Sequence, residues 1–193
     1  MRAYTGTEID LGALAGPSLV DMAVSLGRMP RFAGGTRVWP WTVLHHSMVV
    51  DTIIGDTLIH SHRPYRDSVR LYGLLHDAHE SLTGDVPTPF KTGCMREIQD
   101  GIDKAIWHTL GLPPMPTRYA PVIEEADRMA LHAEAIEVGP PGLHSNVARS
   151  QDRAIVRMIA ERYSSPYDSS PPQGKLCIDW IDDINLLIES CVK

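Results

Sequence analysis

The sequence lacks the features that mark secreted or membrane proteins. It holds three cysteines, Cys94, Cys177 and Cys191, an odd number without the spacing of a metal site. We therefore expect a reducing compartment and no disulfide framework. No apolar run is long enough to span a bilayer, and no basic-then-apolar leader opens the chain. These absences predict a cytoplasmic protein with no membrane partner.

Positive charge is also scarce. Lys and Arg total 18 against 24 Asp and Glu, which gives a formal net charge of −6. This balance argues against a broad surface for a nucleic-acid polymer. It leaves room for a small phosphate-bearing ligand, because a metal ion or a few local cations can reverse the field inside a pocket. With 193 residues, 43% hydrophobic and 22% charged, the chain fits one globular domain.

Apolar residues recur at helical spacing between Pro- and Gly-rich breaks, and no strand alternation stands out. The pattern predicts an all-α fold. We expect helices over 17–27, 42–59, 67–82, 94–110, 121–138 and 146–163. Residues 1–163 would form the domain, 164–174 a linker, and 175–193 a C-terminal amphipathic helix that packs on the domain or on a partner.

Nine histidines are the main excess in the composition, and two of them lie on apolar helix faces. His76 precedes Asp77 in LLHDAHE, where Leu74 and Leu75 draw that part of the predicted helix inward. His46 shares a face with Val49, Val50 and Ile53, while His45 lies nearer the edge of that face. Alone, each histidine reads as a packed core residue or a solvated polar group; together they favour a ligand cluster.

Asp127 adds an acid on the apolar side of the helix predicted over 121–138. It shares a face with Ile123, Ala130 and Leu131. A buried carboxylate needs a partner, and a divalent cation is one such partner. His46, His76, Asp77 and Asp127 would then supply a mixed nitrogen and oxygen ligand set. Such a set suits a borderline or harder divalent metal, which can lower the pKa of a bound water.

Four motifs extend this cluster into a longer pattern: LHHS at 44–47, LLHDAHE at 74–80, TGDVPTP at 83–89 with Lys91, and EEAD at 124–127. In this order they resemble the HD-domain phosphohydrolase superfamily, named for its His-Asp doublet. The match is closest to the small 5'-deoxynucleotidase branch and its phage relatives, and it covers roughly residues 28–135. The doublet alone is a weak signal, whereas the doublet followed by Glu80 and TGDVPTPFK is specific.

The resemblance implies a role for each matched residue. The metal ligands would be His46, His76, Asp77 and Asp127. Glu80 matches the acid that handles the attacking water, and Asp85 matches a second active-site acid. Arg31 and Phe32 match an Arg–aromatic pair that contacts phosphate and nucleoside. The charges of Arg37 and Lys91 could also neutralise phosphate, although a solvated surface position is equally open for both.

The resemblance implies a hydrolase that uses one divalent ion (Co, Mn, Zn or Mg) on 2'-deoxynucleoside 5'-phosphates, in a bacterial or phage-infected cytoplasm. The leading form is a 5'-deoxynucleotidase, which converts a deoxynucleoside monophosphate to the deoxynucleoside and phosphate. One alternative is a phage-type dNTP (dATP) triphosphohydrolase that releases tripolyphosphate. Another is an HD module that senses a nucleotide without cleaving it. We expect a small-molecule partner, with homo-oligomer formation left open.

Overall fold

The computed structural model describes residues 1–38, 40–163 and 172–191, apart from the side chains of residues 88, 172 and 173. Within these residues the fold is all-α, as predicted, and β-pairing is limited to isolated bridges. The helices are α1 (Leu19–Leu26), α2 (Val43–Thr57), α3 (Arg63–Leu74), α4 (Glu80–Thr83), α5 (Gly93–Thr109), α6 (Ala120–Glu137), α7 (Ser150–Tyr163) and α8 (Pro172–Cys191). None of these helices is long and apolar enough to cross a membrane.

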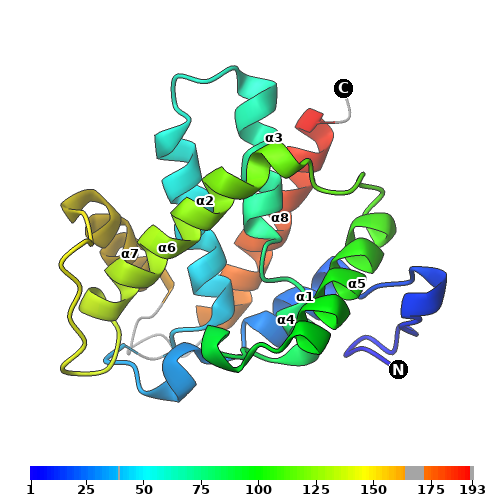
Figure 1. The fold of residues 1–193 in the computed structure, drawn as a ribbon, viewed down its shortest axis with the longest axis horizontal. Coiled ribbons are helices and arrows are strands. Elements are labelled where there is room, and N and C mark those ends of the chain that lie inside the picture. The colour runs from blue at the N-terminus through cyan, green and yellow to red at the C-terminus, as the bar shows by residue number, and fades with distance from the viewer. Residues whose placement is uncertain (39, 164–171, 192–193) are drawn as a thin grey trace.

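Helix α2 is the centre of the bundle. It packs against α3, α6, α7 and α8, and Figure 1 shows α6 (yellow-green) crossing it. Because neighbours surround α2, its polar residues His45, His46 and Asp51 are buried with its apolar ones. His45, expected nearer the edge, is therefore fully buried, and its Nδ1 lies 2.8 Å from Thr42 Oγ1 at the start of the helix.

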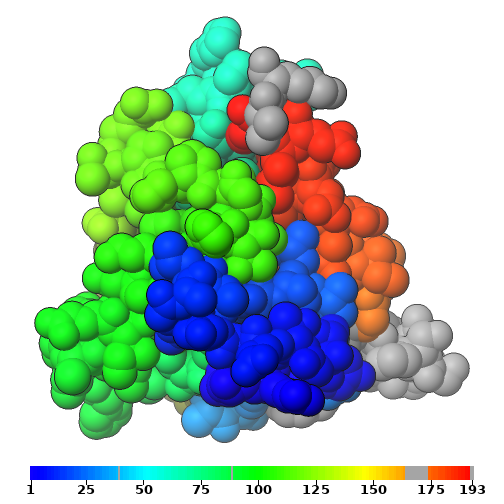
Figure 2. Space-filling model, turned by 90° about the vertical axis from the view of Figure 1, so that its right-hand side faces the viewer, coloured from blue at the N-terminus to red at the C-terminus, as the bar shows by residue number. Residues whose placement is uncertain are grey.

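Helix α8 belongs to the same hydrophobic core. Leu176, Trp180, Ile184 and Leu187 are buried in it, and the helix contacts α1, α2, α3 and α7. Figure 2 shows the N-terminal segment (dark blue) and α8 (orange to red) on one face of the molecule. Most of the predicted linker, 164–171, lies outside the described residues, and the remainder is the first turn of α8.

The helix predicted over 67–82 is wrong in its second half. Helix α3 begins earlier, with Pro64 in its first turn, and ends at Leu74. Turns follow, then the single turn of α4, which stops at Gly84 with φ +81°. Leu75 and Ala78 remain buried, so the apolar spacing of a helix continues through a segment that is not one.

The end of α3 is held close to α2. A Cβ on Gly73 would lie 2.4 Å from Ile54 Cδ1, so the absence of a side chain permits the approach. His76 Nδ1 donates a hydrogen bond of 2.7 Å to the Gly73 carbonyl and satisfies a backbone group that the helix end leaves open. The imidazole of the HD doublet is thereby fixed at the junction of the two helices.

Candidate active site

The four predicted metal ligands converge from three parts of the fold. His46 comes from α2, His76 and Asp77 from the turn after α3, and Asp127 from α6. His46 Nε2 lies 2.9 Å from Asp127 Oδ1 and 3.8 Å from Asp77 Oδ2. His76 Nε2 lies 3.2 Å from Asp77 Oδ2 and 4.0 Å from Asp127 Oδ1. The Asp127 side chain is 46% exposed, yet this oxygen faces the cluster.

In both histidines the hydrogen bond of Nδ1 fixes the orientation of the ring and therefore the direction of Nε2. His76 Nδ1 donates to the Gly73 carbonyl, and His46 Nδ1 lies 2.9 Å from Glu134 Oε1. Both Nε2 atoms therefore face the carboxylates, and His76 Nε2 is buried without a hydrogen-bond partner. Imidazole nitrogens held this way, next to carboxylate oxygens, fit a divalent cation.

The carboxylates and imidazoles of the cluster shift one another's pKa values. Burial alone would lower the pKa of His76, but the neighbouring carboxylates Asp77 and Asp127 outweigh it and raise that pKa to about 9. Burial would raise the pKa of Asp77, but His76, His46 and Arg31 hold it well below its usual range. Without a metal, protons on the imidazoles balance the acids; a bound cation would take their place.

A pocket of about 370 Å³ opens beside the cluster. It is lined by Arg31, Phe32, Asp77, Glu80, Asp85, Val86, Pro87, Pro89, Lys91, Asp127 and Leu131. A larger pocket of about 470 Å³ lies under the N-terminal segment, but neither a predicted ligand nor Glu80 lines it. The smaller pocket is the candidate active site because the convergent polar groups open into it.

Glu80 is a buried acid at the edge of this pocket. Its side chain is 3% exposed, Oε1 lies 3.5 Å from Lys91 Nζ, and Oε2 makes no hydrogen bond. Burial, together with the negative charges of Asp77 and Asp85, raises the pKa of Glu80 to about 7. A carboxyl with that pKa can both accept and return a proton near neutral pH.

Arg31 and Phe32 form part of the pocket wall in a short, irregular turn. Arg31 Nε donates to Glu134 Oε2 at 3.1 Å, and its Nη1 lies 4.0 Å from Asp77 Oδ2. Phe32 has φ +52°, a left-handed conformation that is uncommon for an aromatic residue. Such strained positions cluster at ligand sites, because the surrounding structure holds them for a purpose other than stability.

Arg37 is not brought to the pocket. Its Nε donates to the Gly139 carbonyl at 2.9 Å, and its Nη2 donates to the Ile136 carbonyl. These are carbonyl groups at the C-terminal end of α6, where a positive side chain is favourable. The interpretation of Arg37 as a phosphate ligand is therefore not supported by its position, unlike those of Arg31 and Lys91.

Sequence reasoning missed Glu134, which is fully buried behind the cluster. It accepts from His46 Nδ1 on one oxygen and from Arg31 on the other. One signal was available: Glu134 follows Asp127 by seven residues, two helical turns, on the same face of α6. The other acids of this region, such as the exposed Glu124 and Glu125, gave no reason to single it out.

His79, in the turn that carries the His-Asp doublet, is buried. Its Nδ1 lies 3.1 Å from Asp103 Oδ1 on α5, and its Nε2 makes no hydrogen bond. Ligand atoms of Asp77, His79 and Glu80 lie within 4.8 Å of one another. His79 therefore supports the same turn from the side of α5.

The chain is similar to two known proteins in sequence and to a solved structure in fold. No family model matches the chain. An uncharacterized protein of Rhodobacter capsulatus is 28% identical over 155 residues, which cover 76% of each chain. The uncharacterized protein YfdR of Escherichia coli is 29% identical over 108 residues, 53% of this chain and 54% of that protein.

A solved structure resembles most of the fold. The cyanophage S-2L HD phosphohydrolase DatZ, bound to dA and one catalytic Zn²⁺ ion, has a TM-score of 0.51 and 17% identity, over 89% of this chain and 99% of that one. At this identity the likeness concerns the fold. The expected resemblance is thus confirmed in the architecture and in the cluster of His46, His76 and Asp127. The chain has the fold of an HD phosphohydrolase and carries a His/Asp cluster of the HD type.

Proposed function

We propose that the chain is a divalent-metal-dependent phosphohydrolase of 2'-deoxynucleoside 5'-phosphates, and that its main activity is that of a 5'-deoxynucleotidase. One observation carries the proposal. Two imidazoles with their Nε2 atoms turned toward two carboxylates adjoin a pocket that also holds a buried acid, Glu80, and two cations. This combination of groups suits hydrolysis of a phosphate ester.

The metal would be held by His46, His76, Asp77 and Asp127. When bound, a divalent ion supplies an acidified water and polarises a phosphoryl oxygen. The mixed nitrogen and oxygen set suits a catalytic Zn²⁺, Co²⁺ or Mn²⁺ ion. A closed structural zinc site is usually built from Cys and His instead.

The remaining residues would position the substrate and move protons. Arg31 and Lys91 would hold the phosphate oxygens at the mouth of the cluster. Glu80 would accept a proton from the water while the oxygen of that water forms a bond to phosphorus. The bond from phosphorus to the 5' oxygen then breaks, and Glu80 can give the proton to the leaving alcohol. Asp85, on the same wall, is the second acid of the site.

The charge of the pocket favours a monophosphate over a triphosphate. Among the described residues that line it, Arg31 and Lys91 are the positive ones, and Arg31 is already paired with Glu134. The acidic lining residues are Asp77, Glu80, Asp85 and Asp127. A triphosphate brings several more negative charges, which this lining would repel unless metal ions accompanied it. The dNTP triphosphohydrolase is therefore the second candidate.

The apolar part of the wall would receive the nucleoside. The apolar residues that line the pocket are Phe32, Val86, Pro87, Pro89 and Leu131. We propose that Phe32, together with Arg31, closes against the sugar and disfavours a 2'-hydroxyl. A rigid wall can exclude an added hydroxyl by shape, whereas an apolar pocket alone discriminates by only about 10²-fold.

A substrate panel tests the proposal directly. The full chain would be incubated with each dNMP, dNTP, NMP and NTP in Mn²⁺ or Co²⁺, and products identified by chromatography. We expect orthophosphate from dNMPs, none in chelator, and none from His76→Ala. The matched control, His108→Ala, changes a histidine outside the pocket on α5 and should keep full activity. Tripolyphosphate from dNTPs would establish the second candidate instead, and binding without any product would establish a sensor.

A further inference from the structure

One buried carboxylate joins two functional groups that come from distant parts of the chain. Glu134 on α6 has no exposed surface. Its Oε1 lies 2.9 Å from Nδ1 of His46 on α2, and its Oε2 accepts from Nε of Arg31 at 3.1 Å. Each oxygen thus serves a different partner, one in the metal cluster and one on the wall of the substrate pocket.

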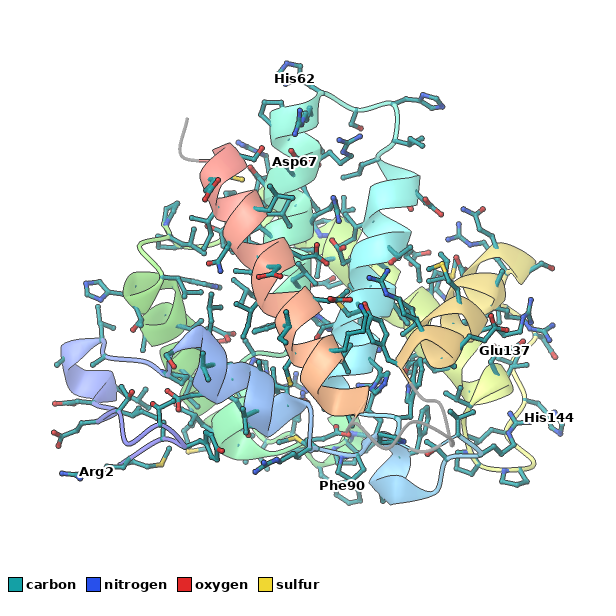
Figure 3. All side chains as sticks on the ribbon, turned by 180° about the vertical axis from the view of Figure 1, so that it is seen from behind. Arg2, His62, Asp67, Phe90, Glu137 and His144 are labelled. Atoms are coloured by element: carbon teal, nitrogen blue, oxygen red, sulfur yellow. The ribbon has the colours of Figure 1, made fainter. Side chains whose placement is uncertain are left out.

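A neighbouring acid shows what an ordinary ion pair on this helix looks like. Glu137, at the C-terminal end of α6, accepts from Arg153 and Arg157 of α7, and those side chains are 39% and 51% exposed. That contact ties two helices together at the surface, as Figure 3 shows for Glu137 near α7. Glu134 differs because it contacts residues of the candidate site and lies where water cannot replace a lost partner.

We propose that Glu134 is a positioning residue that sets His46 for metal binding and Arg31 for phosphate binding; this rests on the proposed function. By accepting the proton of His46 Nδ1, the carboxylate keeps Nε2 turned toward Asp127 and Asp77, where a cation would replace the proton that Nε2 donates to Asp127. By engaging Nε of Arg31, it leaves the other guanidinium nitrogens on the pocket side, where Nη1 lies 4.0 Å from Asp77 Oδ2.

Replacement by glutamine separates this role from simple packing. The Glu134→Gln side chain has nearly the same size, but one of its two oxygens becomes an amide nitrogen. The remaining oxygen can accept a hydrogen bond from His46 or from Arg31. The NH₂ group then faces the other residue, which is also a donor, and no hydrogen bond forms there. Loss of a group that orients a ligand histidine typically costs about 10- to 100-fold in metal affinity.

The experiment measures metal binding before any catalysis. The full chain, stripped with chelator, would be titrated with Zn²⁺ and Mn²⁺ by calorimetry, with Glu137→Gln as the matched control on the same helix. We expect Glu134→Gln to bind metal about 10- to 100-fold more weakly and Glu137→Gln to match the wild type. We also expect KM for the dNMP and the inhibition constant of inorganic phosphate to rise in Glu134→Gln. Unchanged metal affinity in a folded Glu134→Gln protein, or equal losses in both variants, would overturn the proposal.

A measurement on the unmodified protein covers the case in which Glu134→Gln does not fold. Nitrogen-15 NMR of the Zn²⁺-loaded wild type should show the His46 proton on Nδ1, protected from exchange by Glu134. A proton on Nε2, with Nδ1 on the metal, would refute the inference. The two proposals fail differently: a wild type that binds metal without hydrolysing any nucleotide defeats the proposed function. A wild type that hydrolyses dNMPs, with unchanged metal affinity in Glu134→Gln, defeats the role of Glu134.

Discussion

Replacing Glu80 by glutamine should inactivate the protein and at the same time stabilise it. The carboxyl is buried, and its pKa of about 7 lies well above its ordinary value of 4.5. Between these two values the unfolded chain releases a proton that the folded chain retains. Stability therefore falls as the pH rises through this window, and the full cost is present above pH 7. Glutamine resembles the protonated carboxyl, so Glu80→Gln avoids the cost.

The size of the effect follows from the difference between the two pKa values. A shift from 4.5 to about 7, at about 1.4 kcal/mol per unit, corresponds to roughly 3 kcal/mol above pH 7. For a chain of this size that is a rise in Tm of roughly 6–12 °C as an upper bound. Loss of a general acid–base group lowers kcat by about 10²–10⁴-fold. Greater stability with lost turnover is the mark of an acid retained for function.

Urea denaturation in chelator at a series of pH values measures the difference. We expect Glu80→Gln and the wild type to be about equally stable at pH 4.5, with the variant increasingly more stable up to pH 8. Glu124→Gln, which removes the same charge from an exposed position on α6, should show no such divergence. Equal stability of Glu80→Gln and the wild type at pH 8 would refute the raised pKa of Glu80. An unchanged kcat would remove Glu80 from the mechanism.

Four further changes test separate parts of the site and fold. Lys91→Met should raise KM for a dNMP by about 10- to 100-fold in steady-state kinetics, since a hydrogen bond to a charged group contributes about 1.5–3 kcal/mol; an unchanged KM would place Lys91 outside the phosphate contacts. His76→Ala should abolish stoichiometric metal binding in calorimetry, and full occupancy would contradict its role as a ligand. Arg37→Ala should leave KM unchanged and lower the unfolding free energy by about 1 kcal/mol in urea, because its contacts are carbonyls at the end of α6. Trp180→Ala should cost about 3–5 kcal/mol in the same assay, and a smaller loss would mean that α8 contributes little to the core.

The sequence predicted the helical class and the convergence of the four candidate ligands, because both depend on features that residue types express directly. Apolar spacing marked the helices, and acids or histidines on apolar faces marked the cluster. It left the role of Arg37 open, because a positive charge near a glycine-rich loop looks the same whether it faces a pocket or a helix end. It missed Glu134, because the role of this acid depends on its contact with His46, which lies 88 residues away in the sequence.

The broken helix after Leu74 shows why the site could be predicted more closely than the backbone that carries it. On a continuous helix, successive side chains lie 100° apart, and Glu80 would stand directly above His76. In the turns, His76 and Asp77 face His46 and Asp127, His79 reaches Asp103, and Glu80 borders the candidate pocket. Leu75 and Ala78 keep helical spacing because the same core must be filled either way, so hydrophobicity alone cannot reveal the break. The proposed chemistry requires neighbouring residues to point at different targets, and a turn anchored by two buried apolar residues meets that requirement.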